Sequence, residues 1–433
     1  KNSSACWREA VKKTSRVCPF GLPLIYLSIA LSPFYFWESG LPQISHFVFA
    51  LGAIICLLER RMSIPITPPS KYALAFALYA LLVNGVVYVK YADAHTAWAG
   101  LYYVFNAGVF LLLTGVGVRL ARENSFRSFA WRLSYVLLGL LALELAMQLL
   151  GFGRTFGELR ATGTFNDPNQ FAHWVIWVAV IASLAGWYVF QSWTIGVIAL
   201  ILALSSILLN ASRSGLLGVG WFMFVMGWVW IARMSQLLLG NARVHLGVLS
   251  KVFFSAFFLI VVGSLGLGVA DGGGQVAKFF SERGGFLVQR IVGGLEKGNE
   301  NLVERGYDRL FLFPEYILLG AGEGANERWA EKTVFLGEIH STLAGVLFSY
   351  GAIGFLLLIA LFLHVWRIQP TYVHRLILLS PLFYSVGTYN LRNWFFWIGL
   401  ALAWSMAYDY HLRNVKSTKR SENETPSLPH HPR

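Results

Sequence analysis

The chain is dominated by long apolar segments separated by short polar stretches. A helix needs about 20 mostly apolar residues to cross the hydrocarbon core of a bilayer, and "ALAFALYALLVNGVVYV" and "GVLFSYGAIGFLLLIALFL" are typical of these segments. With 56% hydrophobic and 13% charged residues, the 433-residue chain carries more apolar surface than a water-soluble protein of this size can bury. The sequence therefore predicts an all-α integral membrane protein, because helices satisfy their own backbone hydrogen bonds in lipid.

About twelve segments have the length and composition of a transmembrane helix. The first is expected to be a retained anchor and not a cleaved leader. The predicted spans are 19–37, 43–58, 71–90, 97–118, 128–150, 169–189, 193–209, 215–232, 250–270, 341–363, 375–390 and 393–410.

The distribution of lysine and arginine predicts the orientation. Cytoplasmic loops carry an excess of these residues, and they are concentrated before 19, after 410 and in alternate loops. The short segments of the opposite face hold only Lys90, Arg154, Arg160, Arg213 and Arg392. Both termini are therefore expected in the cytoplasm. The net charge of +13 then reflects these loops and anionic membrane lipids, and no nucleic-acid partner is expected.

This topology divides the chain into five parts. Residues 1–18 form a cytoplasmic N-terminus, 19–270 contain spans one to nine, and 341–410 contain spans ten to twelve. Residues 411–433 are polar and are expected to be a disordered cytoplasmic tail. Residues 271–340 form a large outer loop, in which "NENLVERGYDRLFLFPEYIL" is predicted as a helix broken at Pro314 and "LLGAGEGANERW" as a turn. Loops of this length are usually functional.

Several arginines lie on the outer face, against the trend that sets the orientation. Arginine is always charged and offers a planar fork of donors that suits phosphate oxygens. A converging group would bind a diphosphate and stabilise it as a leaving group. The alternative is that each one reaches the lipid headgroups or pairs locally, which is the favoured interpretation for Arg309 and Arg392. The candidates for diphosphate binding are Arg160, Arg213, Arg290 and Arg305.

His340 stands where the outer loop meets span ten. A neutral imidazole can take a proton from a hydroxyl near pH 7, so His340 is a candidate general base for a sugar hydroxyl. Glu338, two residues earlier, is a possible orienting acid. The alternative for His340 is an interfacial residue that caps the helix. Glu144, inside span five, requires a partner, and a buried arginine is the expected one.

Motifs for nucleotide or metal binding are missing from the sequence. It contains no Walker loop, no Rossmann fingerprint, no HExxH and no pair of acidic residues of the DxD type on the outer side. Asp167 and Glu158 are separated along the chain. The sequence therefore predicts chemistry without metal or cofactor, in which arginines take the role of a cation.

Four segments, in this order, resemble the O-antigen ligase/polymerase superfamily. They are Arg160 with "GTFNDPN", then "NASRSGLLG", then "ERGYDRLFLFPEYILLGAGEGANER", and finally "IHSTLAGVLFSYGAIGFLLL". Together they cover roughly residues 160–360. The chain departs from the pattern in three places. Its Asn-Asp-Pro-Asn turn is one residue longer than the commonest form, Ser341 stands where asparagine is frequent, and Pro314 is followed by a longer run before the glycine turn.

The resemblance implies a glycosyltransferase-C-like bundle in the bacterial inner membrane with a periplasmic active site. The donor would be a glycan on undecaprenyl diphosphate, and for a ligase the acceptor would be the lipid A–core of lipopolysaccharide. Transfer would invert the anomeric centre without metal. Carried over by position, Arg160, Arg213 and Arg290 would contact the diphosphate, and His340 would help to activate the acceptor. The catalytic set is therefore His340, Arg160 and Arg290, with Arg305 as a further diphosphate ligand.

Three alternatives remain open at this point. An O-antigen polymerase and a protein O-oligosaccharyltransferase use the same donor, and the acceptor is not written in any motif. The ligase is favoured by the single large loop between spans nine and ten and by the short polar C-terminus. A transporter or flippase also fits twelve spans. Transporters, however, place their unusual polar residues near the midplane, whereas here they cluster at the outer face.

Overall fold

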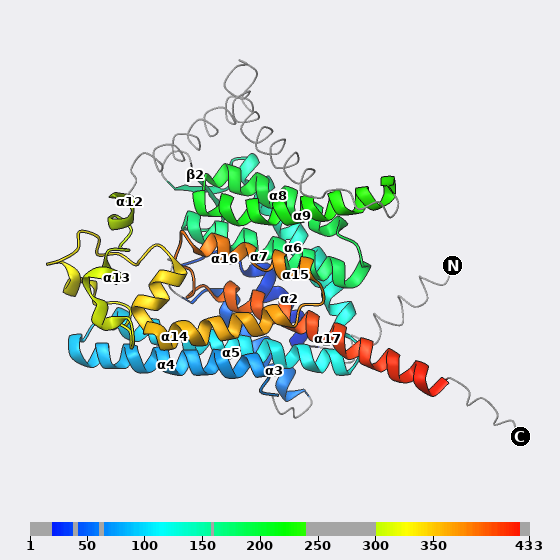
Figure 1. The fold of residues 1–433 in the computed structure, drawn as a ribbon, viewed down its shortest axis with the longest axis horizontal. Helices are drawn as coiled ribbons and strands as arrows, with labels where there is room; N and C mark the ends of the chain where they lie inside the picture. The colour runs from blue at the N-terminus through cyan, green and yellow to red at the C-terminus, as the bar shows by residue number, and fades with distance from the viewer. Residues whose placement is uncertain (1–19, 38–41, 60–64, 157–159, 240–299, 425–433) are drawn as a thin grey trace, which may run out of the picture.

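The computed structural model describes residues 20–37, 42–59, 65–156, 160–239 and 300–424. The described chain is mostly helical, and six of its helices are long and apolar enough to cross a membrane. These helices, shown in Figure 1, are α4 (Pro68–Tyr91), α5 (Ala94–Arg122), α6 (Phe126–Leu149), α7 (Pro168–Phe190), α9 (Arg213–Leu239) and α14 (Thr342–Arg367). Many large apolar side chains remain exposed on them. The chain thus has the construction of an all-α membrane protein.

The other predicted spans differ from the expectation in several ways. Three are apolar helices shorter than a full span: α2 (Gly21–Leu31), α3 (Ile44–Leu58) and α8 (Thr194–Asn210). The prediction of one helix over 375–390 is wrong, because α15 (Tyr372–Ile377) and α16 (Ser380–Ser385) replace it. Pro381 lies at the start of α16, and proline cannot continue the hydrogen bonding of a preceding helix. The predicted span 250–270 lies outside the described residues.

The polar segments also required correction. Helix α17 (Trp394–Glu424) continues past 410, so the expected disorder of 411–424 is wrong. The helix expected in the outer loop is reduced to α12 (Glu300–Val303) and α13 (Arg309–Leu312). Between them Gly306 has a φ of 75°, which a helix does not accept. A small hairpin of β1 (Arg154–Phe156) and β2 (Arg160–Gly163) was not predicted.

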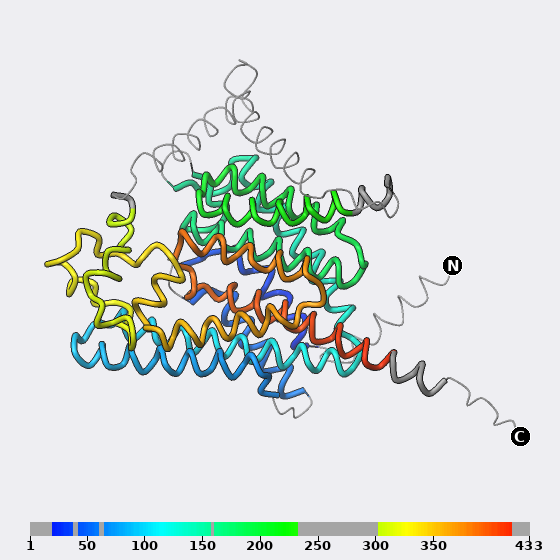
Figure 2. Tube along the Cα trace, viewed as in Figure 1, coloured from blue at the N-terminus to red at the C-terminus, as the bar shows by residue number. Residues whose placement is uncertain are grey.

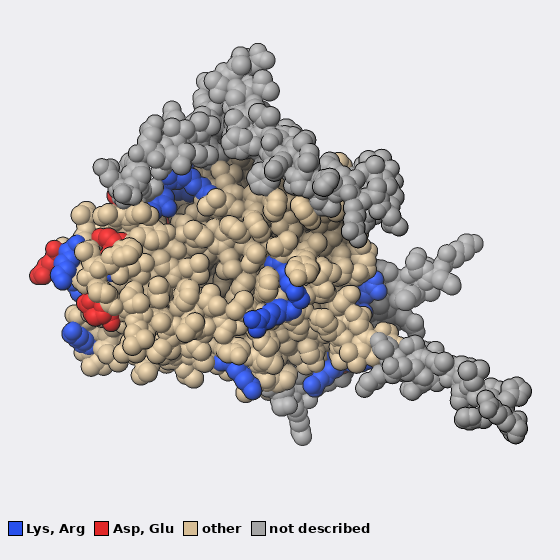
Figure 3. Space-filling model, viewed as in Figure 1, with Lys and Arg blue, Asp and Glu red and all other residues tan. Residues whose placement is uncertain are grey.

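Helix α7 occupies the centre of the bundle. In the most apolar 18-residue stretch of α7, 89% is buried inside the protein. In the corresponding stretch of the peripheral helix α4, only 33% is buried. Helix α17 packs between α5 and α7, and α14 packs on α4. Figure 2 shows that residues before α14, the α4–α5 turn and the start of α17 meet at one end, although they are far apart in sequence. On the face drawn in Figure 3 the acidic side chains gather at this same end.

Helix α14 is interrupted at Gly351, where φ is 61° and ψ is −171°. The helical carbonyls freed by the kink are used by the glycine-rich loop: Ala321 N–H donates to Phe348 O at 2.9 Å and Gly322 N–H to Ser349 O at 2.8 Å. In return, Ala352 N–H donates to Ile317 O at 2.7 Å. Buried backbone groups must find partners, so the kink fixes residues 317–322 against α14.

Candidate functional site

A cavity of about 460 Å³ opens at the end of the bundle where these segments meet. Its walls come from the α2–α3 connection, the starts of α5 and α7, the segment before α14 and the loop before α17. Much of the lining is of two kinds. Carboxamides are contributed by Gln43, Asn106, Asn169, Gln170, Asn390 and Asn393, and aromatic rings by Tyr35, Tyr102, Phe105, Phe335, Tyr389 and Trp394. The lining also includes Asp167, Glu338 and Arg392.

The helices that frame the cavity begin with side-chain caps. Asp93 caps α5 and Asp167 caps α7, each accepting backbone N–H groups of the first turn. Ser341 caps α14 by accepting from Ala344 N–H. Such caps satisfy donors that the helix leaves free. They fix where each helix starts and therefore where the adjoining side chains of the cavity lie.

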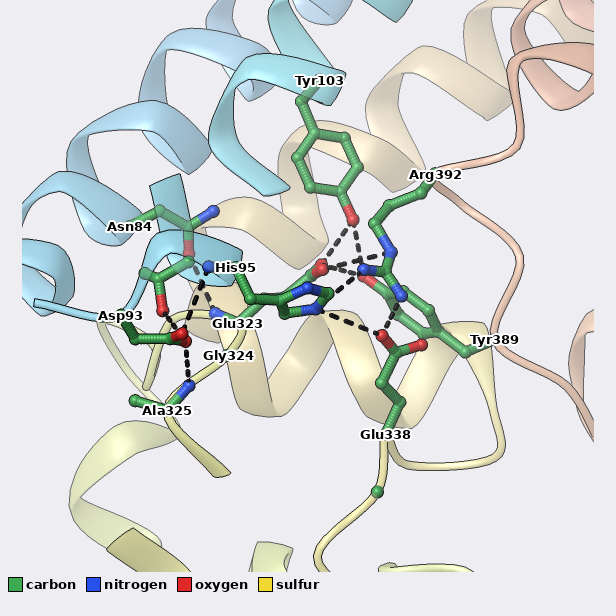
Figure 4. A network of polar contacts seen from close by, with 12 residues as sticks. Asn84, Asp93, His95, Tyr103, Glu323, Gly324, Ala325, Glu338, Tyr389 and Arg392 are labelled. Atoms are coloured by element: carbon green, nitrogen blue, oxygen red, sulfur yellow. Dashed lines mark hydrogen bonds and ion pairs between the residues drawn. The ribbon is translucent and has the colours of Figure 1, made fainter. Parts of the chain in front are cut away.

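Arg392 lies at the centre of the charged side of the cavity (Figure 4). Its Nη2 donates to Glu338 Oε1, and its Nε lies 3.5 Å from Glu323 Oε2. Its Nη1 lies 3.2 Å from Nε2 of His95. These contacts agree with the interpretation of Arg392 as a locally paired residue. Arg392 and its partner Glu338 nevertheless both line the cavity.

Glu323 is the important residue that the sequence analysis missed. Its carboxylate is buried and accepts hydrogen bonds from the hydroxyls of Tyr103 and Tyr389. Its backbone N–H donates to Asn84 Oδ1 at 2.9 Å. A buried carboxylate is costly unless it is paired. The available signal was a lone acidic residue among glycines in "GAGEGA", a segment that we interpreted only as a turn.

The loop that carries Glu323 is tied to the turn between α4 and α5. Ala325 N–H donates to Asp93 Oδ2 at 2.6 Å. The guanidinium of Arg328 donates to the carbonyls of Ala321 and Gly322 and lies 4.2 Å from the ring of Trp329. These contacts hold the positive-φ glycines of the loop in place.

His340 reaches the cavity from the segment just before α14. Its N–H donates to Arg305 O at 3.1 Å, and its carbonyl accepts from the Tyr307 hydroxyl at 3.1 Å. Desolvation of the buried part of the ring lowers the pKa of His340, the charge of Arg305 lowers it further, and Asp167 opposes both. The imidazole is therefore neutral near pH 7, which is the form that accepts a proton.

The structure brings only part of the predicted site together. Glu338 and His340 both line the cavity, and Arg305 contacts the backbone of His340. The carboxylate of Glu338 is directed to Arg392 and lies 4.0 Å from His95 Nε2. Glu338 was predicted to orient the ring of His340, but its carboxylate is instead directed to Arg392 and His95.

The remaining candidate arginines lie elsewhere or outside the described chain. Arg160 Nε donates to Asn210 O at 3.3 Å, which links β2 to the end of α8. Arg213 is the first residue of α9. Neither is among the residues that line the cavity. Arg290 lies outside the described residues. Arg309, interpreted from sequence as structural, donates to the carbonyls of Phe335 and Gly337.

Glu144 has a different partner from the one expected. Its Oε2 accepts from Thr164 N–H at 3.1 Å and its Oε1 from the Thr164 hydroxyl at 2.5 Å. The same hydroxyl donor lies 2.6 Å from Pro33 O. The expectation of an arginine partner for Glu144 is therefore wrong, because its carboxylate accepts from Thr164 and holds the turn after β2.

The comparisons with known proteins found no family model that matches this chain and no significantly similar curated protein. Within the described residues, no group of three or more His, Cys, Asp or Glu side chains is arranged to hold a metal ion.

Proposed function

We propose that this protein is an O-antigen ligase, which transfers a glycan from undecaprenyl diphosphate to lipid A–core oligosaccharide. The observation that carries the proposal is the cavity at the end of the bundle, where His340 meets a wall of carboxamides and aromatic rings. Carboxamides both donate and accept hydrogen bonds, as sugar hydroxyls require. Aromatic rings offer flat apolar surface for the carbon face of a sugar.

We place the cavity at the periplasmic face of a bacterial inner membrane, in a twelve-span, glycosyltransferase-C-like bundle with both termini in the cytoplasm. The distribution of charge supports this orientation. The opposite end of the described bundle carries Lys71, Arg122, Arg127 and Arg367 near its helix ends, whereas on the face drawn in Figure 3 acidic side chains gather at the cavity end. An excess of basic residues marks the cytoplasmic side.

In the proposed reaction the acceptor hydroxyl attacks the anomeric carbon of the donor glycan. The hydroxyl proton passes to Nδ1 or Nε2 of neutral His340, the new glycosidic C–O bond forms, and the bond to the diphosphate breaks. The diphosphate leaves with the bonding electron pair, and the anomeric centre is inverted. Arg305, whose charge acts on His340, is the proposed stabiliser of that negative charge. For Arg160 and Arg213, which do not line the cavity, and for Arg290, diphosphate binding stays a prediction from the sequence.

Reconstitution tests the proposal. Purified protein in liposomes is given a glycan linked to undecaprenyl diphosphate, with and without lipid A–core, and the products are separated by electrophoresis. Glycan on lipid A–core, formed only when both substrates are present and without an energy source, is the expected result. Longer chains on the carrier lipid, independent of lipid A–core, would instead define a polymerase, and no transfer at all would contradict both.

The pH dependence of transfer is expected to follow the pKa of His340. A histidine base is lost when the pH falls through its pKa, so the lowered pKa moves the acidic limb below the usual value of about 6.5. Arg305→Gln removes a charge that lowers the pKa and should move this limb to higher pH. Asp167→Asn, which retains a helix-capping residue, should move it to lower pH. Initial rates from pH 4.5 to 8 measure both shifts, and an identical limb in all three proteins would exclude His340 as the titrating base.

Transfer is also expected to continue in excess EDTA, because the proposed mechanism uses arginine side chains where other transferases use a divalent metal ion. The measurement is the initial rate before and after dialysis against the chelator. A divalent-dependent glycosyltransferase treated in parallel should lose its activity. Loss of transfer here, restored by added Mg²⁺ or Mn²⁺, would contradict the metal-free mechanism.

A further inference from the structure

Arg392 is shared by two carboxylates with different surroundings. The side chain of Glu323 is 5% exposed, and that of Glu338 is 38% exposed. In Figure 4 the carboxylate of Glu323 lies in the middle of the network, and Glu338 approaches Arg392 from the segment before α14. The two partners therefore differ in how easily they can leave.

Glu323 is held from several directions. The hydroxyls of Tyr103 and Tyr389 both donate to its Oε1, and Asn84 accepts its backbone N–H. The backbone of Arg392 is also anchored, because Asn106 Nδ2 donates to its carbonyl at 3.0 Å. Glu323 lies on the Nε side of the guanidinium and fixes the position of the cation, while Nη2 is the nitrogen that donates to Glu338.

Glu338 has fewer ties to the rest of the protein. Its carboxylate meets Arg392 and lies 4.0 Å from Nε2 of His95, a side chain that is itself 55% exposed. Both Glu338 and Arg392 line the cavity. Ion pairs this accessible to water contribute little stability, so a competing anion can replace Glu338 at small cost.

We propose that Arg392 forms a subsite for a phosphate-type anion of the substrate, which Glu338 occupies until that anion displaces it. The inference rests on the proposed function, since it adds an anion subsite to the same cavity. Arginine binds phosphate oxygens through paired N–H donors, as it binds a carboxylate. The exchange of one anion for another leaves Arg392 neutralised and Glu323 undisturbed. The anion belongs either to the donor diphosphate or to a phosphate group on the acceptor.

Anion binding to the purified full-length protein in detergent tests this subsite. Inorganic diphosphate and inorganic phosphate are titrated at low ionic strength, and binding is followed by isothermal calorimetry. Glu338→Gln removes the competing carboxylate and should tighten binding about threefold. Arg392→Gln removes the charged donors and should weaken binding at least about tenfold. Glu331→Gln is the matched control, because it makes the same charge change on an exposed side chain of the same segment.

The pattern of affinities decides the outcome. Unchanged or weaker binding in Glu338→Gln would overturn the proposal, even if Arg392→Gln failed to fold, and so would wild-type affinity in Arg392→Gln. Tightening in Glu331→Gln equal to that in Glu338→Gln would reduce the effect to net charge and also overturn it. A preference for diphosphate assigns the subsite to the donor, and equal affinity for phosphate assigns it to the acceptor. Failure of glycan transfer in liposomes would contradict the ligase but leave these affinities unaffected.

Discussion

His340→Ala is expected to reduce glycan transfer by at least about 100-fold, the typical contribution of a positioned general base. His340 supplies a neutral imidazole at the cavity. Its backbone is held in place by two hydrogen bonds, one to the carbonyl of Arg305 and one from the hydroxyl of Tyr307. Removal of the ring leaves those backbone contacts in place. The protein should therefore insert, fold and bind the donor as the wild type does.

The measurement is the initial rate in liposomes, with thermal unfolding in detergent as the check on folding. His95→Ala is the control, since it removes another exposed histidine of the same cavity. Its rate should stay much closer to the wild-type value. A His340→Ala rate within about threefold of wild type would exclude the general-base role and leave His340 as an interfacial side chain without a part in the chemistry, since Ser341 provides the cap of α14.

Gly351→Ala is expected to lower the free energy of unfolding by about 3 kcal/mol or more. A φ of 61° with a ψ of −171° is open almost exclusively to glycine. An added Cβ would also collide with the backbone of Leu318. The variant can fold only by moving residues 317–322 away from α14, which also displaces Glu323.

Gly85→Ala is the control, because an added Cβ there meets nothing within 4 Å. In a helix this change is neutral or slightly stabilising. Thermal or chemical unfolding in detergent compares the two variants. Equal stability of Gly351→Ala and wild type would mean that the kink does not depend on glycine at this position.

The helical part of the fold could be predicted from the sequence because the thickness of the bilayer sets the length of an apolar segment that crosses it as a helix. The expected segments 71–90 and 341–363 agree closely with α4 and α14. The expected span 375–390 failed because its composition is apolar enough, while Pro381 breaks its hydrogen bonding. Composition thus predicts a membrane segment, but local backbone chemistry decides whether it is one helix.

The candidate site was predictable only where a single position stood out. His340 was singled out because a titratable ring at the start of an apolar helix is unusual, and the structure places it in the lining of the cavity. Glu323 and Arg392 were missed or given a minor role, because their meaning depends on long-range contacts. Glu323 contacts Tyr103, Tyr389 and Arg392, which all lie 66 or more residues away in sequence. Nothing in the local pattern around either residue specifies such partners.

The hydrogen bond between Asp93 and Ala325 joins positions 232 residues apart. Contacts with such large separations are entropically costly to form, because the loop-closure entropy of the intervening chain is lost before the contact stabilises the fold. The glycine-rich loop can dock only when α4, α5 and α14 are already side by side. During synthesis, therefore, the bundle is assembled before the rim of the cavity is closed, and a chain that stalls before α14 is inserted would present an incomplete site unable to hold substrate.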